Sequence, residues 1–262
     1  MLFKRELKRN LKSLLIVCIM CAALVMYVIS IAPSFGKDIQ QLLDLKLPMQ
    51  VQSAFGMKNL DFGTPIGFYG LIFPYIYLII SIYISGIFAS IVLKEFSDKT
   101  AEYLFSLPAK RMKIISTKLS VAFLYSILTV VIIFLISILS FSLFIKEDYE
   151  FLPVLLMSVS WFLGGITFGS IAFLASTFFS KTRSATGIAT GIVLMMYLLQ
   201  VVISLNNDLE KLKYFSPFDW FKGSDIANTS EISATYCIIA VVVSVVCIAV
   251  GAIRFRKKDV LI

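Results

Sequence analysis

The chain has 262 residues, of which 59% are hydrophobic, and its mean hydropathy is +0.91. Ordinary soluble domains are about 45–50% apolar, so this composition excludes the soluble globular class. The formal net charge is +8, yet no domain of interleaved basic and aromatic residues carries it. The basic excess therefore indicates membrane topology and contact with the lipid surface, and it excludes a nucleic-acid-binding protein.

The 24 basic and 16 acidic residues all lie outside six uncharged stretches of at least 22 residues each. About 20 helical residues cross the roughly 30 Å hydrocarbon core of a bilayer, and a charge at its centre costs roughly 2.5–3.5 kcal/mol. The sequence therefore predicts an all-α membrane protein with a single transmembrane domain over residues 1–262. Its six spans are expected at about 14–32, 69–93, 119–145, 151–179, 185–205 and 234–253.

The basic residues also predict the orientation. With both termini in the cytoplasm, the cytoplasmic segments carry 17 Lys and Arg residues and the external segments carry 7. Acidic residues show the opposite trend, with 5 and 11. Cytoplasmic loops of membrane proteins are enriched in Lys and Arg, so we expect both termini, and segments 94–118 and 181–183, in the cytoplasm.

Residues 1–12 form a basic segment before the first span. Phe3, Leu7 and Leu11 recur every four residues, with basic side chains on the other faces. The segment is either an interfacial helix on the inner leaflet or a positive flank that only fixes the topology. A signal peptide has a similar leader, but the apolar run 14–32 exceeds the usual length of its apolar region, so we expect a retained span.

The segment between the second and third spans is amphipathic. Phe96, Thr100, Tyr103 and Leu104 share one helical stripe, and Pro108 ends the helix because the residue before a proline avoids the α region. This helix either lies against lipid or docks in the groove of a cytosolic partner. Periodicity alone favours the lipid-bound alternative.

Glycines recur at four-residue spacing in two spans, as Gly165 and Gly169 and as Gly187 and Gly191. This spacing lets helix backbones approach closely, either within the bundle or against a second subunit.

The loop 206–233 contains a cluster of five aromatic residues. At this position aromatic side chains usually form a belt at the membrane interface, and a gate over an exit is the alternative. The cluster comprises Tyr214, Phe215, Phe218, Trp220 and Phe221.

The sequence lacks the usual signatures of a catalytic or energy-converting protein. It contains no phosphate-binding loop and no histidine, and no ionisable residue falls inside a predicted span. The four cysteines lie in apolar helices, where we expect small buried side chains and neither a disulfide nor a metal site. Such a chain has no means of its own to power transport, so another protein is expected to drive it.

Four segments resemble the family of type-2 ABC exporter permeases. Residues 95–118 contain Thr-x-Glu, Leu-x-Ser-Leu-Pro and a basic pair, as the loop between the second and third spans of that family does. Residues 47–70, 212–221 and 254–261 resemble its first outer loop, its loop between spans five and six, and its C-terminal tail. Lys99 stands where the family often has glycine.

The resemblance implies a multi-pass permease subunit of the plasma membrane. Its partners would be a second permease, identical or homologous, and two cytosolic ATPase subunits that bind ATP and magnesium, while this chain would hold no cofactor and would not be an enzyme. The amphipathic helix would be a coupling helix that contacts the ATPase, and the translocation path would lie between the two permeases. The implied coupling residues are Glu95, Phe96, Thr100, Glu102, Tyr103, Leu104, Pro108 and Arg111.

We therefore expect an ATP-driven exporter of an amphipathic or hydrophobic substrate, such as a peptide, toxin, antibiotic or lipid. This choice of substrate follows from the uncharged walls of the predicted spans, because small charged solutes need polar partners within the membrane. The alternative is a membrane-embedded regulatory or scaffold protein that anchors a cytosolic partner.

Overall fold

The computed structural model describes residues 2–46, 52, 56–57, 60–97, 111–145 and 149–257. These residues are almost entirely helical, and no strand occurs among them. Six helices are long and apolar enough to span a membrane, which confirms the predicted six-helix membrane fold. The elements are α1 (Leu2–Lys46), α3 (Pro65–Ser97), α5 (Arg111–Phe144), α6 (Phe151–Ser176), α7 (Thr182–Leu205), η1 (Asn207–Phe215), α8 (Pro217–Trp220), α9 (Gly223–Thr229) and α10 (Ala234–Lys257).

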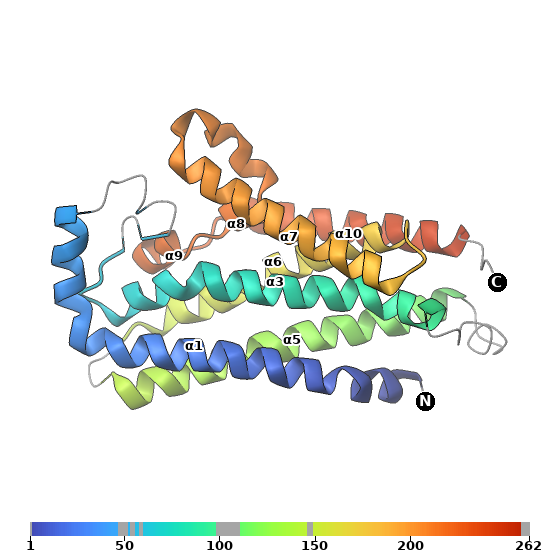
Figure 1. Cartoon of the computed structure of the whole chain (residues 1–262), viewed down its shortest axis with the longest axis horizontal. Coiled ribbons are helices and arrows are strands. Elements are labelled where there is room, and N and C mark those ends of the chain that lie inside the picture. Colours follow the sequence, from blue (N-terminus) through green and yellow to red (C-terminus); the bar gives the residue numbers. More distant parts are fainter. Residues whose placement is uncertain are drawn as a thin grey trace.

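Both ends of the described chain lie at the same end of the bundle, together with the last turn of α3 and the first turn of α5 (Figure 1). We call this the terminal end, and the opposite one, where α3 begins, the distal end. The first and third apolar segments run over Glu6–Ser34 and Met112–Phe144, so they begin several residues before the predicted spans. The extra turns lie at the terminal end and carry charged residues, among them Glu6 and Lys118.

α3 and α6 form the centre of the bundle. In each of them 61% of the most apolar 18-residue stretch is buried inside the protein, against 17% in α7 and 22% in α10. α1 packs against α5, α10 packs against α6, and α7 packs against α3. The two central helices therefore have their apolar faces covered by protein, whereas α7 and α10 present most of their apolar surface to lipid or to another chain.

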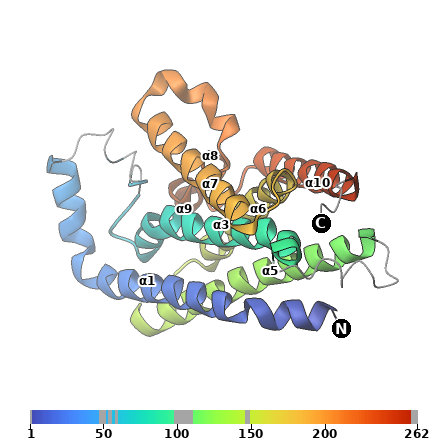
Figure 2. The same cartoon turned by 45° about the vertical axis from the view of Figure 1, so that its right-hand side comes forward.

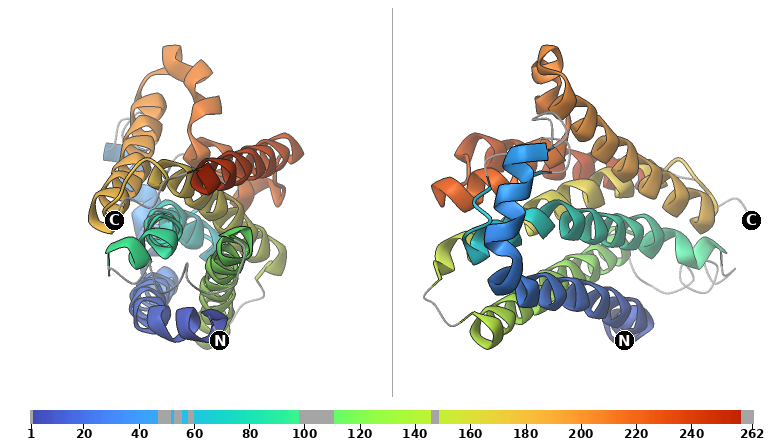
Figure 3. Two further views of the ribbon diagram at one scale, coloured as in Figure 1. Left: turned by 90° about the vertical axis from the view of Figure 1, so that its right-hand side faces the viewer. Right: turned by 60° about the vertical axis from the view of Figure 1, so that its left-hand side comes forward.

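α1 is one helix that bends near both ends. Pro33 lies inside it, and proline removes a helical hydrogen bond and clashes with the preceding turn, so the helix turns away at the distal end (Figure 1). Its first turns run across the axis of the rest (Figure 3, left). The predicted N-terminal interfacial helix is therefore continuous with the first span, and its contact with the membrane surface stays a prediction.

Aromatic side chains fill the space between α3 and α6. Trp161 of α6 stacks on Phe73 of α3, and the Trp161 Nε1 donates to the Phe73 carbonyl oxygen at 3.3 Å. The Tyr69 hydroxyl donates to the Ser137 Oγ of α5 at 2.8 Å. A polar group without a partner is costly inside a bilayer, so these bonds allow large aromatic rings with polar atoms to fill the core.

α7 leans away from the other helices towards the distal end, and η1 returns the chain from its tip to α8 (Figures 1 and 2). The outer face of α7 is accordingly exposed, with Met195 at 70% and Leu198 at 62% of their full accessibility. The segment that follows α7 is thus brought back into the bundle, where it meets α3 and α6.

Candidate functional site

Most of the predicted coupling residues, Thr100, Glu102, Tyr103, Leu104 and Pro108, lie outside the described residues. Glu95 and Phe96 belong to the last turn of α3, and Arg111 is the first residue of α5. The structure therefore places the two points from which the predicted coupling segment starts and to which it returns, and both lie at the terminal end (Figure 1).

A buried ion pair joins the helices at these two points. The Lys118 Nζ of α5 lies 3.1 Å from the Glu6 Oε1 of α1, and it also donates to the Ile91 carbonyl oxygen of α3 at 2.8 Å. The side chains are almost fully buried, at 1% and 0% exposure. One ammonium group thus binds three helices together at the terminal end of the bundle.

Further polar contacts surround this ion pair. The Lys94 Nζ of α3 donates to the Asn10 Oδ1 at 2.9 Å, and the Asn10 Nδ2 donates to the Glu6 carbonyl oxygen at 3.4 Å. Arg9 forms a second ion pair with Glu6 at 3.3 Å. We call these residues, Glu6, Arg9, Asn10, Lys94 and Lys118, the anchor cluster.

The anchor cluster holds the N-terminal segment against α3 and α5 of the bundle. Nearby, the Tyr125 hydroxyl donates to the Leu7 carbonyl oxygen. This packing is not evident from hydropathy and charge, which report only how a segment relates to the membrane. One signal was present: Glu6 is the single acidic residue among residues 1–12, and an acid in a basic leader needs a partner.

A second polar site lies in the segment after α7, which enters the bundle from the distal end. The Tyr77 hydroxyl of α3 donates to the Pro217 carbonyl oxygen at 3.1 Å, and the Ser216 Oγ donates to the Met196 carbonyl oxygen of α7 at 3.2 Å. At about 1.5 Å per residue, Tyr77 lies about 18 Å from the start of α3, near the middle of the span Pro65–Ile91. α8 is therefore a re-entrant turn, which packs at the level of the middle of this apolar segment of α3.

Gly164 of α6 makes room for this turn. A Cβ atom at Gly164 would lie 1.6 Å from the Tyr77 hydroxyl oxygen, which is far inside contact distance. Phe218 of α8 packs on Tyr77 and Phe168, with ring centroids 4.6 and 5.0 Å apart. The absence of a side chain at one residue of α6 thus allows the tyrosine to hold the re-entrant turn.

The expectation of an aromatic belt in this loop is wrong for three of its five residues. Phe218, Trp220 and Phe221 are buried in the bundle, at 1%, 7% and 1% exposure. Tyr214 and Phe215 of η1 are exposed, at 55% and 71%. Apolar composition alone did not distinguish a re-entrant segment from an interfacial one, because both contain aromatic residues.

An acidic residue lies at the end of the re-entrant turn. The Asp219 side chain is 1% exposed, and its Oδ1 lies 3.0 Å from the Nζ of Lys222, which is 39% exposed. Neither carboxylate oxygen accepts a further hydrogen bond from the described residues. Burial raises the pKa of the Asp219 carboxyl, and the ammonium groups of Lys222 and Lys213 act in the opposite direction.

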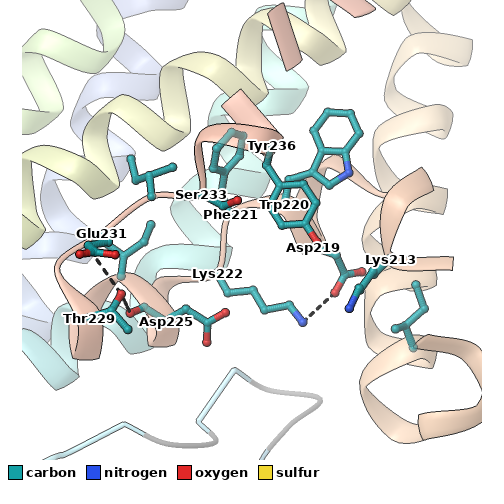
Figure 4. A pocket seen from close by; sticks show the side chains of 13 residues that line it. Lys213, Asp219, Trp220, Phe221, Lys222, Asp225, Thr229, Glu231, Ser233 and Tyr236 are labelled. Atoms are coloured by element: carbon teal, nitrogen blue, oxygen red, sulfur yellow. Dashed lines mark hydrogen bonds and ion pairs between the residues drawn. The ribbon is translucent and has the colours of Figure 1, made fainter. Parts of the chain in front are cut away.

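The Asp219–Lys222 pair borders a cavity of about 540 Å³, which we call the re-entrant cavity. Its walls come from the end of α7, η1, the α8–α9 turn and the start of α10. Figure 4 shows the Lys222 side chain extending towards Asp219, with Lys213 on the other side of that carboxylate. The charged lining residues are Lys213, Asp219, Lys222, Asp225 and Glu231.

The two glycine pairs lie in different surroundings. Cβ atoms at Gly165 and Gly169 would lie 2.5 Å from Ile84 and 2.9 Å from Phe88, so both glycines face α3 of the same chain. At Gly187 and Gly191 a Cβ atom would meet nothing within 4 Å. The α6 pair is therefore used within the bundle, and the predicted subunit contact of the α7 pair stays a prediction.

Comparison with known families identifies a family that covers nearly the whole chain. The model described as ABC-2 family transporter protein matches residues 1–260. A search of curated proteins found no match.

Proposed function

The chain belongs to the family of ABC-2 transporter proteins, and from this premise we propose that it is the permease subunit of an ATP-driven exporter. A family of ABC transporters implies a cytosolic ATPase as partner, and six apolar helices fit a multi-pass protein of the plasma membrane. The proposal adds export as the direction and an amphipathic or hydrophobic molecule as the cargo. It also adds two ATPase subunits, which bind ATP and magnesium, and a second permease, identical or homologous.

The anchor cluster is the observation that carries this proposal. A movement of the ATPase against the segment between α3 and α5 is transmitted to the bundle only if the helices at both ends of that segment are held together. Lys118 holds them together, because its ammonium group contacts α1 and α3 while its backbone belongs to α5. Motion of an ATPase bound to residues 98–110 is thereby transmitted to three helices at once.

The predicted coupling contact is tested by Tyr103→Ala. Large aromatic residues dominate protein interfaces, and the loss of one costs about 2 kcal/mol, or roughly a thirtyfold loss of affinity for the ATPase. The measurement is the amount of ATPase that copurifies with the permease in mild detergent, followed by transport in proteoliposomes. Tyr27→Ala is the matched control, since Tyr27 is 67% exposed in the first span, far from the connecting segment.

Two outcomes distinguish the alternatives. If Tyr103→Ala and Glu95→Ala both retain the ATPase and normal transport, the segment lies against lipid and the coupling proposal fails. If the ATPase binds wild type but no compound stimulates its activity or is transported, the chain is a scaffold that anchors a cytosolic partner.

The second permease copy is tested separately at α7. We expect Gly191→Leu to reduce the yield of permease dimer, because a bulky side chain would stand where two backbones are predicted to meet. Gly191 has open space around it within this chain, so the substitution leaves the single bundle intact. An unchanged dimer yield with normal transport would place the subunit interface elsewhere.

A further inference from the structure

We propose that the re-entrant cavity binds a hydrophobic organic cation, a molecule with one positive charge on an apolar body. The inference concerns this chain alone and does not depend on the transport proposal. It rests on three features of one cavity: the buried Asp219 carboxylate, the partly exposed Lys222 that a ligand can displace from it, and a wall of aromatic side chains.

The carboxylate of Asp219 supplies the binding charge. It lies between the levels of Tyr77 and Gly70 along α3, because Pro217 contacts Tyr77 and Gly223 closely approaches Gly70. An ionised carboxylate can accept about four hydrogen bonds, and this one has a single cationic contact at 3.0 Å among the described residues. A charge buried to this extent requires a compensating partner, so the site favours a bound cation.

The present partner of Asp219 can be displaced. Lys222 is 39% exposed, and its ammonium group lies at the end of a flexible four-carbon chain that can turn to water. It stands only three residues from Asp219, and among the described residues its ammonium group forms no ion pair with another helix of the bundle. A ligand cation can therefore replace Lys222 at the carboxylate without loss of a tertiary contact.

The charge of the cavity favours a cation over an anion. Three carboxylates, those of Asp219, Asp225 and Glu231, face two ammonium groups, those of Lys213 and Lys222. One bound monovalent cation would bring the net charge of these five groups from −1 to zero. An anion would have to approach a buried carboxylate in a medium of low dielectric constant, where like charges repel strongly.

The remaining walls suit an apolar body. Aromatic rings line the cavity and attract cations through their faces, and aliphatic side chains complete the lining. The volume of about 540 Å³ falls within the roughly 300–1,000 Å³ that is typical of sites for small molecules. The apolar lining residues are Ile203, Trp220, Phe221, Ile226, Ile232 and Tyr236.

The test uses a pair of probes with the same shape and opposite charge, tetraphenylphosphonium and tetraphenylborate. The full chain is placed in nanodiscs of phosphatidylcholine, and binding is measured by equilibrium dialysis against empty nanodiscs, which corrects for partition into lipid. Trp220 lines the cavity and one other tryptophan, Trp161, lies outside it, so fluorescence of Trp161→Phe gives a second readout at the site itself.

Two substitutions should act in opposite directions. Asp219→Asn removes the buried charge and should weaken binding of tetraphenylphosphonium about tenfold or more. Lys222→Gln removes the competing ammonium and should strengthen it by about two- to fivefold. Glu150→Gln is the matched control, because Glu150 is an exposed acid at the distal end that does not line the cavity.

The proposal is overturned if the wild-type protein binds the two probes equally, since the cavity is then merely apolar. It is also overturned if neither substitution changes the affinity for the cation. Should Asp219→Asn fail to fold, the contrast between the probes on wild type and the gain expected for Lys222→Gln still decide the question.

Discussion

The bundle carries a buried ion pair towards each end, and the two pairs differ in what their lysines contact. At the terminal end, Lys118 is 1% exposed, pairs with a residue 112 positions away and also donates to the backbone of a third helix. Towards the distal end, Lys222 is 39% exposed and pairs with a residue three positions away. Both carboxylates are almost completely buried, at 0% and 1% exposure.

The difference separates a structural role from a binding role. If the ammonium group of Lys118 moved away, the buried Glu6 carboxylate would lose its principal partner in an apolar interior. The pair at the terminal end therefore fixes the packing of α1, α3 and α5. A half-exposed lysine at the edge of a cavity leaves its carboxylate available to another cation. Burial of the lysine, more than burial of the acid, therefore decides which of the two roles an ion pair has.

The largest effect is expected for Lys118→Met, which leaves the Glu6 carboxylate buried without its principal partner. Removal of one member of a buried pair costs about 3–5 kcal/mol, and we expect a value near the lower limit because Arg9 stays 3.3 Å from Glu6. The free energy of unfolding is measured by denaturant titration in detergent.

Two variants serve as controls for this prediction. Lys8→Met changes an exposed lysine of α1, the helix that carries Glu6, and should have little effect. Glu6→Gln combined with Lys118→Met removes both charges and should recover part of the lost stability, since no uncompensated charge is then buried. If Lys118→Met is as stable as wild type, the terminal pair is not structural and the comparison between the two pairs fails.

A smaller loss is expected for Gly164→Ala, which adds a methyl group where the Tyr77 hydroxyl now lies. Overpacking of this kind typically costs about 1–3 kcal/mol. Because the hydroxyl must leave Pro217, the re-entrant turn should also loosen, and protease cleavage within 206–230 should become faster. Gly191→Ala is the control, because a Cβ atom there meets nothing within 4 Å. Equal cleavage rates in the two variants would show that Tyr77 does not hold the turn.

The sequence was sufficient to predict the six spans because their signal is local: a stretch without charge and long enough to cross a bilayer is a span in any context. It was also sufficient for the family, whose motifs occur in a fixed order. Neither ion pair was predicted. Glu6 and Lys118 meet through tertiary packing, which hydropathy does not encode.

The re-entrant turn escaped prediction for a different reason. Segment 206–233 contains charged and aromatic residues in mixed order, which is typical of a loop at the interface. Its position in the bundle depends on Gly164 and Tyr77, which belong to other helices. Gly164 lies beside the GxxxG motif but outside its four-residue spacing, so the sequence pattern did not single it out. Steric room at one glycine thus decides where a distant loop lies.

The smallest effect on stability is expected for Lys222→Gln, and it sharpens the comparison most directly. Lys222 is 39% exposed and the ammonium group of Lys213 still acts on Asp219, so the free energy of unfolding should fall by about 1 kcal/mol, several times less than for Lys118→Met. The two substitutions each remove one lysine from a buried carboxylate, and they differ in how far that lysine was itself exposed. Lys211→Gln, an exposed lysine of η1 outside the cavity, controls for loss of charge in the segment. If Lys222→Gln destabilises the protein as much as Lys118→Met does, exposure of the lysine does not distinguish the two ion pairs, and Lys222 is a structural residue like Lys118.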